Sequence, residues 1–219
     1  MLRHDLELRR FEDVDPLGRV AGGDLNLGGP LDAARAQACL LLLHRESHDY
    51  PGLDSILVYP HAYLAPTTEV APGGIVVEGS SARLGESWVR GVVVLSWDDV
   101  ISGARDRAHG HNVVLHEFAH QLDQEDGRAD GAPILEHRGL YTAWARILSG
   151  EFERLRREVG AGRPTDIDPY GATNPAEFFA VVTEAFFERP AALKRRHPEL
   201  YAELELFYKQ DPLCLHVPA

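Results

Sequence analysis

The sequence predicts an α+β fold in which short strands precede a helical half. Three runs rich in β-branched residues, each bounded by glycine or proline on at least one side, predict strands at residues 55–60, 73–79 and 91–97. Apolar residues then recur at helical spacing, which predicts helices at residues 111–123, 138–159, 176–188 and 198–210. Strands first and helices afterwards is the order typical of α+β domains.

The segment before the first strand combines a loop with a helix. Residues 21–30, "AGGDLNLGGP", are rich in turn-forming residues and predict a loop. The apolar run of residues 31–45, "LDAARAQACLLLLHR", predicts a buried helix. Cys39 lies within this run, so we expect its side chain to fill space in the core.

The composition restricts the class of protein. The 219 residues fit one domain, and 44% hydrophobic with 26% charged residues is the profile of a soluble globular protein. A net charge of -12 disfavours a phosphate-binding face, so no direct contact with nucleic acid is expected. The charged N-terminus and the short apolar runs predict neither a signal peptide nor a membrane span. The two cysteines form no disulfide framework, so we expect a cytoplasmic location.

The stretch "VVLHEFAHQLDQEDG", residues 113–127, contains the motif His-Glu-x-x-His. On a helix, His116 and His120 lie one turn apart on the same side, close enough to share one tetrahedral ion. Glu117 is then placed to act as the general base that activates a zinc-bound water. Zinc would lower the pKa of that water to about 7 and polarise the substrate carbonyl. The alternatives are an exposed histidine row on a surface helix or core histidines satisfied by hydrogen bonds. The apolar character of this helix, together with a glutamate at position 117, disfavours both.

A hydrolytic zinc site usually has a third protein ligand, and four downstream residues are candidates. Asp123 is on the same helix, where its short side chain suits a hydrogen bond to a ligand imidazole better than the metal. His137 lies in a predicted loop and is a further candidate. Glu177 and Glu184 are seven residues apart on one face of an apolar helix, where a buried carboxylate needs a partner. Glu177 also fits a capping arrangement in "NPAE", so spacing alone does not decide between the two glutamates.

Three stretches of the sequence resemble the MtfA (Mlc titration factor A) family of zinc-dependent peptidases: "PGLDSILVYP", "GHNVVLHEFAHQLDQEDG" and "DPYGATNPAEFFAVVTEAFFERP". The resemblance extends from about Ala36 to Pro212 and implies a zincin-like (gluzincin) fold, with a small twisted sheet over the active-site helix. It also implies one zinc-peptidase domain, residues 1–219, in three parts: a divergent N-terminal segment (1–35), the sheet and active-site helix (36–125), and the helical half with the third ligand (126–219).

The resemblance implies a role for each residue of these motifs. His116 and His120 correspond to two ligands of a single zinc ion (Zn2+), and Glu117 corresponds to the catalytic glutamate. The glutamate of "AEFFA" is the third ligand, which here is Glu177. Tyr170 in "DPYGATN" corresponds to a tyrosine that faces the zinc, where its phenol could donate a hydrogen bond to the tetrahedral oxyanion.

Two further acidic residues are expected to hydrogen-bond the metal ligands without binding the metal themselves. Glu184 is expected to orient His116 or His120, and Asp123 to hydrogen-bond a ligand imidazole. In enzymes of this type an edge strand pairs with the extended substrate backbone. Residues 91–97 are the candidate for that strand, with a plain internal strand as the alternative.

These observations predict a zinc-dependent metallopeptidase, aminopeptidase-like on short peptides. An acidic group near the cleft should then hold the free ammonium of the substrate, with Glu86, Asp98 and Asp99 as candidates. The alternative is a regulatory binding protein, because the family is named for sequestering Mlc, a transcriptional repressor, and an Mlc-like repressor would be its partner. A glutamate at position 117 favours the enzyme, since a structural zinc site has no need of a general base and normally fills all four ligand positions.

Overall fold

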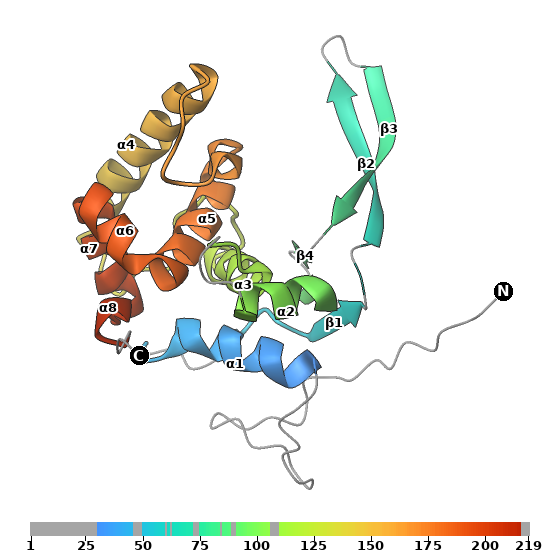
Figure 1. Ribbon diagram of the computed structural model, residues 1–219, viewed down its shortest axis with the longest axis horizontal. Coiled ribbons are helices and arrows are strands. Elements are labelled where there is room, and N and C mark those ends of the chain that lie inside the picture. Colours follow the sequence, from blue (N-terminus) through green and yellow to red (C-terminus); the bar gives the residue numbers. More distant parts are fainter. Residues whose placement is uncertain are drawn as a thin grey trace, which may run out of the picture.

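The computed structural model describes residues 30–45, 50–59, 61, 63–71, 75–83, 85–88, 91–105 and 110–215. Within these residues the strands come first and helices make up the second half, so the α+β prediction is confirmed (Figure 1). The elements, in chain order, are α1 Pro30–Leu42, β1 Ser55–Tyr59, β2 Tyr63–Ala71, β3 Ile75–Arg83, β4 Gly85–Trp88, β5 Val92–Ser96, α2 Trp97–Arg105, α3 Val113–Asp123, α4 Leu140–Gly160, the 3-10 turn η2 Pro169–Ala172, α5 Pro175–Glu188, α6 Pro190–Arg196, α7 Pro198–Tyr208 and α8 Pro212–Leu215. Residues 1–29 of the predicted divergent segment lie outside the described residues.

A small mixed sheet has the strand order β1-β5-β4. Strand β1 pairs with β5 in parallel, with Ile56 opposite Val93, and β4 pairs with β5 antiparallel on its other side. Of the two alternatives for residues 91–97, the internal strand is therefore confirmed and the edge strand is wrong. The run Val93, Val94 and Leu95 is buried, and an unbroken apolar run of this kind is typical of a central strand.

Strands β2 and β3 form a separate antiparallel hairpin that projects from the rest of the chain (Figure 1). The sequence predicted a strand near residues 73–79 but missed β2. Strand β2 contains Pro66, which faces Ser80 in the register. Because proline cannot donate a ladder hydrogen bond, it argues against a central strand and is tolerated in a two-stranded ribbon, where each strand has a free edge.

The core lies where the helical half meets α3. Helix α3 buries Leu115, Phe118 and Leu122 completely, and α5 packs against it with Phe179 and Phe186, which are equally buried. Each such side chain stabilises the fold by roughly 1.5–3 kcal/mol relative to exposure. Figure 1 shows α3 between the helices of the C-terminal half and α1.

Helix α1 packs against the core differently from the expectation. Ala34, Ala38 and Leu41 are buried, whereas Cys39 is exposed, so the prediction that Cys39 fills the core is wrong. The run "ACLLLL" is apolar all round, and periodicity alone could not assign its inner face. Among the described residues, no helix combines the length and the apolar character needed to cross a membrane.

Candidate metal centre

Asn112 starts helix α3 and fixes it to its neighbours. Its backbone is extended, and its side-chain oxygen accepts hydrogen bonds from the backbone N–H groups of Val114 and Leu115, both at 3.2 Å. This is the N-cap that a helix of 11 residues needs for its first free donors. The side-chain amide donates to Gln37 on α1 and Glu188 on α5, so the helix begins at a fixed place between those two elements.

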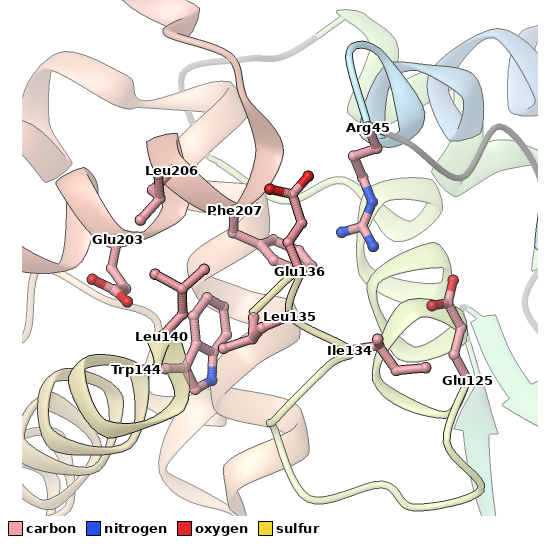
Figure 2. Close-up of a pocket in the computed structure, with 10 residues that line it drawn as sticks. All are labelled: Arg45, Glu125, Ile134, Leu135, Glu136, Leu140, Trp144, Glu203, Leu206 and Phe207. Carbon is pink, nitrogen blue, oxygen red and sulfur yellow. The ribbon is translucent and has the colours of Figure 1, made fainter. Parts of the chain in front are cut away.

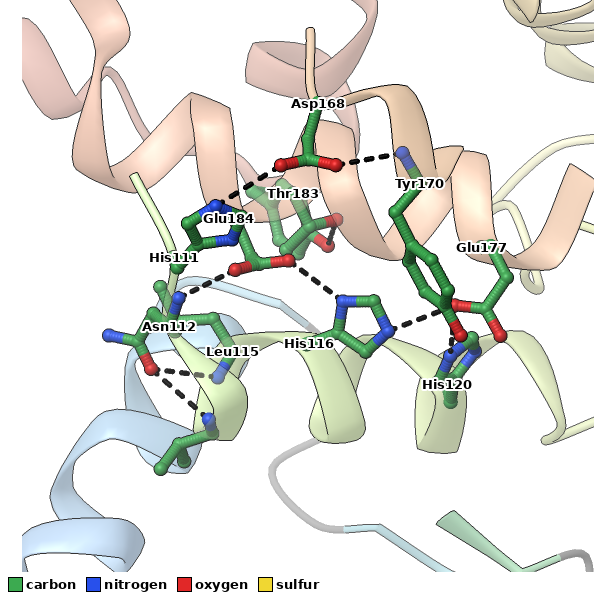
Figure 3. Close-up of polar contacts among 12 residues, drawn as sticks. His111, Asn112, Leu115, His116, His120, Asp168, Tyr170, Glu177, Thr183 and Glu184 are labelled. Carbon is green, nitrogen blue, oxygen red and sulfur yellow. Dashed lines mark hydrogen bonds and ion pairs between the residues drawn. The ribbon is translucent and has the colours of Figure 1, made fainter. Parts of the chain in front are cut away.

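The two histidines of the motif share one face of α3. The ring centroids of His116 and His120 are 4.9 Å apart, and the rings stand nearly perpendicular to each other. Both side chains are largely buried, as expected for residues one turn apart on a helix with a mostly apolar surface. Figure 3 shows both rings directed toward the first turn of α5.

Helix α5 brings Glu177 to these rings. Asn174 caps the helix by accepting the Glu177 N–H at 2.9 Å, and Pro175 occupies the first helical position, as "NPAE" predicted. The carboxylate Oε2 of Glu177 lies 3.0 Å from Nε2 of His116 and 3.4 Å from Nε2 of His120 (Figure 3). The chain therefore brings two imidazole nitrogens and one carboxylate oxygen to a single point.

The three donors fit a divalent metal ion. One ligand atom from each of His116, His120 and Glu177 lies within 4.8 Å of the other two. Ligands about 2.1 Å from a tetrahedral ion lie roughly 3.4 Å apart, which is close to the separations between Glu177 and the two rings. Two imidazoles and a carboxylate are also the donor set of several hydrolytic zinc sites, which keep a fourth position open.

Glu184 contacts the same imidazole from its other side. Its Oε1 lies 2.7 Å from Nδ1 of His116, and its Oε2 accepts the backbone N–H of Asn112 at 2.5 Å. A proton on Nδ1 of His116 donates to Glu184 and leaves Nε2 free to act as a ligand atom. The spacing in the sequence did not decide which of the two glutamates is the third ligand. In the structure Glu177 faces both imidazole rings, whereas Glu184 reaches only the ring of His116.

The charges of this cluster depend on one another. Burial alone would lower the pKa of His116, but its hydrogen bonds with Glu177 and Glu184 outweigh burial and raise that pKa to about 10. Burial would raise the pKa of Glu177, but its hydrogen bonds with His116 and His120 hold it well below the usual range. The imidazole of His116 thus lies between two carboxylates, and both favour its positively charged form.

Glu117 is buried beside the two rings on α3, at 6% exposure. Burial raises the pKa of Glu117 to about 7, and the neighbouring His116 and His120 oppose the shift. A carboxylate that changes protonation near neutral pH is suited to general-base chemistry, because it can both accept a proton and release it.

Asp123 ends helix α3 but does not contact a ligand imidazole. Its Oδ2 accepts the backbone N–H of Gly131 at 3.0 Å, and its Oδ1 is buried without a hydrogen-bond partner. Burial raises the pKa of Asp123 to about 6, against the bond from Gly131. The expected hydrogen bond to the histidine ring is therefore absent, because the side chain turns toward the following loop. His137 is exposed in that loop, outside the donor cluster.

Tyr170 lies on the turn η2, above the ring of His116. The two ring centroids are 6.0 Å apart, and Tyr170 is 54% exposed. Asp168 holds the turn: one carboxylate oxygen accepts the Tyr170 N–H at 2.7 Å, and the other lies 3.1 Å from Nε2 of His111 (Figure 3). Sequence reasoning did not single out Asp168 or His111. The pair "DP" before the tyrosine, which favours a side-chain-capped turn, was the available signal.

Two of the three acidic residues that were expected to hold a substrate ammonium have a structural role in the helix that carries them. Asp98 and Asp99 occupy the first turn of α2, where carboxylates favour the positive end of the helix dipole. Asp98 also pairs with His61 at 2.6 Å on the surface. Glu86 lies on β4, opposite Val94 of β5.

Known proteins resemble most of this chain. Residues 32–209 match the family described as glucose-regulated metallo-peptidase M90. The chain belongs to this family. Its curated relatives include proteins with the name Mlc titration factor A, so the resemblance noted in the sequence is confirmed. A family of metallo-peptidases implies a metal ion, with which the cluster of His116, His120 and Glu177 is compatible.

Three relatives give the extent of the match. An uncharacterized protein of Synechocystis sp. is 46% identical over 179 residues, which cover 81% of this chain and 65% of that protein. Mlc titration factor A of Serratia proteamaculans is 38% identical over 166 residues, and that of Pectobacterium atrosepticum is 35% identical over 166 residues. Those matches cover 74% of this chain and 62% of each relative. The chain thus spans slightly less than two thirds of the length of these relatives.

Proposed function

We propose that this protein is a zinc-dependent metallopeptidase with a gluzincin-like site, aminopeptidase-like on short peptides. One observation carries the proposal: His116, His120 and Glu177 converge on one point beside a buried Glu117, in a chain of a metallo-peptidase family. A structural zinc site would normally fill its four positions with protein ligands, whereas this cluster offers three from the part of the chain that the structure describes. The single zinc-peptidase domain and the cytoplasmic location expected from the sequence stay predictions.

Each residue of the proposed site has its own role. His116, His120 and Glu177 would hold one zinc ion, and Glu184 would keep His116 in the tautomer whose Nε2 faces the ion. When bound, zinc supplies Lewis acidity: it lowers the pKa of water and polarises a carbonyl. Imidazole and carboxylate ligands suit zinc, and cobalt or nickel could replace it in vitro.

Glu117 is the proposed general base. Its carboxylate takes a proton from the attacking water and, once protonated, gives the proton to the departing amine. Burial favours this exchange because it brings the pKa of Glu117 to about 7. Tyr170 is proposed to donate its phenolic hydrogen to the oxygen that gains negative charge as the carbonyl is attacked. Its place above His116 on an exposed turn supports that role.

Strand β4 is the proposed docking strand for an extended peptide. It is one of the two outer strands of the β1-β5-β4 sheet as far as the described residues go, and it is the one that packs against α3. An outer strand offers backbone N–H and C=O groups that a peptide can pair with. Glu86 on β4 and the pair Asp98 and Asp99 at the start of α2 are the proposed candidates for recognising a substrate ammonium.

A second role is proposed from the names of the related proteins. Several are named Mlc titration factor A. Binding of an Mlc-like transcriptional repressor, with or without peptidase activity, is therefore the alternative function. Direct nucleic-acid binding is not proposed, since the net charge is -12.

The test combines metal content with hydrolysis of a panel of amino-acid anilides. Wild-type protein should carry one zinc per chain and cleave part of the panel. Glu117→Gln should keep its zinc and lose roughly 100-fold or more of the hydrolysis rate. Glu153→Gln is the matched control, because it makes the same chemical change on the exposed surface of α4. A zinc-loaded wild type that cleaves nothing would turn the proposal toward the repressor-binding role.

A further inference from the structure

Gly131 lies at a junction of three elements that surround the metal centre. Its backbone N–H donates to Oδ2 of Asp123, the last residue of α3, at 3.0 Å. Its carbonyl accepts a hydrogen bond from Nε1 of Trp144 on α4, also at 3.0 Å. The residue is buried, so both backbone groups are satisfied within the protein.

Gly131 also touches the beginning of α5. A Cβ atom added at this position would overlap the backbone oxygen of Pro175 and would lie 2.8 Å from its carbonyl carbon. Neither atom can give way as a flexible side chain could, because both belong to the first residue of a helix. The missing side chain is therefore what allows the loop to approach α5 so closely.

The position of Pro175 bears directly on the metal centre. Glu177 follows it by two residues in the same helical turn, and its carboxylate lies 3.0 Å from Nε2 of His116 and 3.4 Å from Nε2 of His120. A shift of the first turn of α5 by a few tenths of an ångström would change both separations. Asp123 ties the same glycine to the helix that carries the two histidines.

We propose that Gly131 is a positioning residue for the zinc site: by lacking a side chain, it sets the distance between the end of α3 and the first turn of α5, and so the spacing of the three ligands. The inference rests on the proposed function, because it assumes that these residues bind zinc. The contact with Trp144 completes the junction. Trp144 packs against the rings of Phe179 and Phe207, and with Leu135 and Leu140 it lines a pocket of about 220 Å³, as Figure 2 shows.

The same loop contains a matched control. Gly131 has φ +76° and Gly127 has φ +83°, so alanine at either position strains the backbone in the same way. A Cβ at Gly127 would meet nothing within 4 Å, whereas one at Gly131 meets Pro175. Gly131→Ala and Gly127→Ala therefore share the backbone strain and differ in the contact.

The experiment measures the zinc dissociation constant of wild type, Gly131→Ala and Gly127→Ala by competition with a chromophoric chelator. The visible spectrum of the cobalt-substituted proteins reports ligand geometry, and melting of the metal-free proteins reports the fold. Both variants should melt lower than wild type. Gly131→Ala should bind zinc about 10–100-fold more weakly and show an altered cobalt spectrum, while Gly127→Ala should stay within about twofold of wild type.

The outcomes separate this inference from the proposed function. Wild type that binds zinc, with equal affinity in both glycine variants, would overturn the role of Gly131 alone. Wild type that binds no zinc would overturn the proposed function and this inference with it. If Gly131→Ala does not fold, Trp144→Phe decides, since it removes the bond to the Gly131 carbonyl and keeps an aromatic ring. It should weaken zinc binding about two- to fivefold, and unchanged affinity would contradict the proposal.

Discussion

The two ends of the α3–α5 helix pair are held together in different ways. At the beginning of α3, the backbone N–H of Asn112 donates to Glu184 in a buried hydrogen bond of 2.5 Å. At the end of α3, Gly131 lies between Asp123 and Pro175, and the close approach depends on a missing side chain. Hydrogen bonds link α3 directly to α5 at the first end, whereas at the second end α5 meets Gly131 in a close steric contact, and the metal centre lies between the two ends.

Glu177 and Glu184 illustrate the difference between the two ends of the helix pair. Glu177 and Glu184 lie on the same helix, and both reach the ring of His116 within 3.0 Å. The side chain of Glu184 is 6% exposed at the hydrogen-bonded end, while that of Glu177 is 19% exposed and also faces His120. Their surroundings, and not their chemistry, distinguish a carboxylate suited to orient a ring from one suited to bind an ion.

The largest effect is expected at Glu177. Replacement by glutamine removes the negative charge that pairs with both rings, so zinc affinity should fall by roughly 100-fold or more. The fold should be less affected, because Glu177 is the more exposed of the two glutamates. Chelator competition and metal-free melting measure the two quantities. Zinc binding at wild-type affinity in Glu177→Gln would remove this residue from the ligand set.

A smaller loss of zinc affinity, with a larger loss of stability, is expected at Glu184. In Glu184→Gln an amide N–H must face either His116 or the Asn112 N–H, both of which donate to the carboxylate. We expect zinc affinity to fall by about 10–100-fold, as for other groups that orient a ligand. The free energy of unfolding should fall by about 1–3 kcal/mol. Equal changes in zinc affinity and in the free energy of unfolding for Glu184→Gln and Glu177→Gln would contradict the contrast between the two ends.

The two helix caps give a further contrast. Asn112→Ala removes a buried cap of α3 together with its bonds to Gln37 and Glu188, and should cost about 1–2 kcal/mol of stability. Asn174→Ala removes the exposed cap of α5 and should cost about 0.5–1 kcal/mol. Urea unfolding of the metal-free proteins measures both. An equal or larger cost at Asn174 would contradict the view that the Asn112 end is the more strongly bonded.

A small effect on stability, with none on zinc affinity, is expected at a second histidine–glutamate pair, which lies outside the α3–α5 helix pair. Nδ1 of His197 lies 2.8 Å from Glu151, much as His116 lies against Glu184. The hydrogen bond from His197 lowers the pKa of Glu151, against the opposing effect of burial. Because this pKa is lower in the folded state, the pair stabilises the fold above the pKa of the unfolded chain, and the stabilisation is lost as the pH falls through the folded value.

Glu151→Gln should therefore lower the free energy of unfolding by about 1 kcal/mol at pH 7. The difference from wild type should begin to shrink as the pH falls below about 4.5, where Glu151 of the unfolded chain becomes protonated, and should be smallest below the lowered pKa of Glu151 in the folded protein. Zinc affinity should not change. Unfolding curves from pH 7 to pH 3 test this, and a difference that grows toward acid would contradict the assignment.

Much of the site could be predicted because its signals are local. The spacing of His116 and His120 on an apolar helix predicts a shared ligand face, and "NPAE" predicts the start of α5. Spacing could not decide between Glu177 and Glu184, since they share one helical face. Only the packing of α5 against α3 determines which of the two glutamates reaches both rings.

The features that were missed depend on contacts distant in the sequence. Nothing in "RADGAP" indicates that Gly131 meets the first residue of α5, 44 positions later in the chain. Strand β4 has only four residues, and Pro66 argued against β2. The central place of β5 follows from its pairing on both sides, which a single run of apolar residues does not reveal.

The most direct test of the account is a crystal structure of the zinc-loaded protein, with anomalous diffraction recorded at the zinc absorption edge. The account predicts one anomalous peak about 2.1 Å from Nε2 of His116, Nε2 of His120 and a carboxylate oxygen of Glu177. A peak bound instead by Glu184, or none at this cluster in crystals of protein that carries zinc, would contradict it.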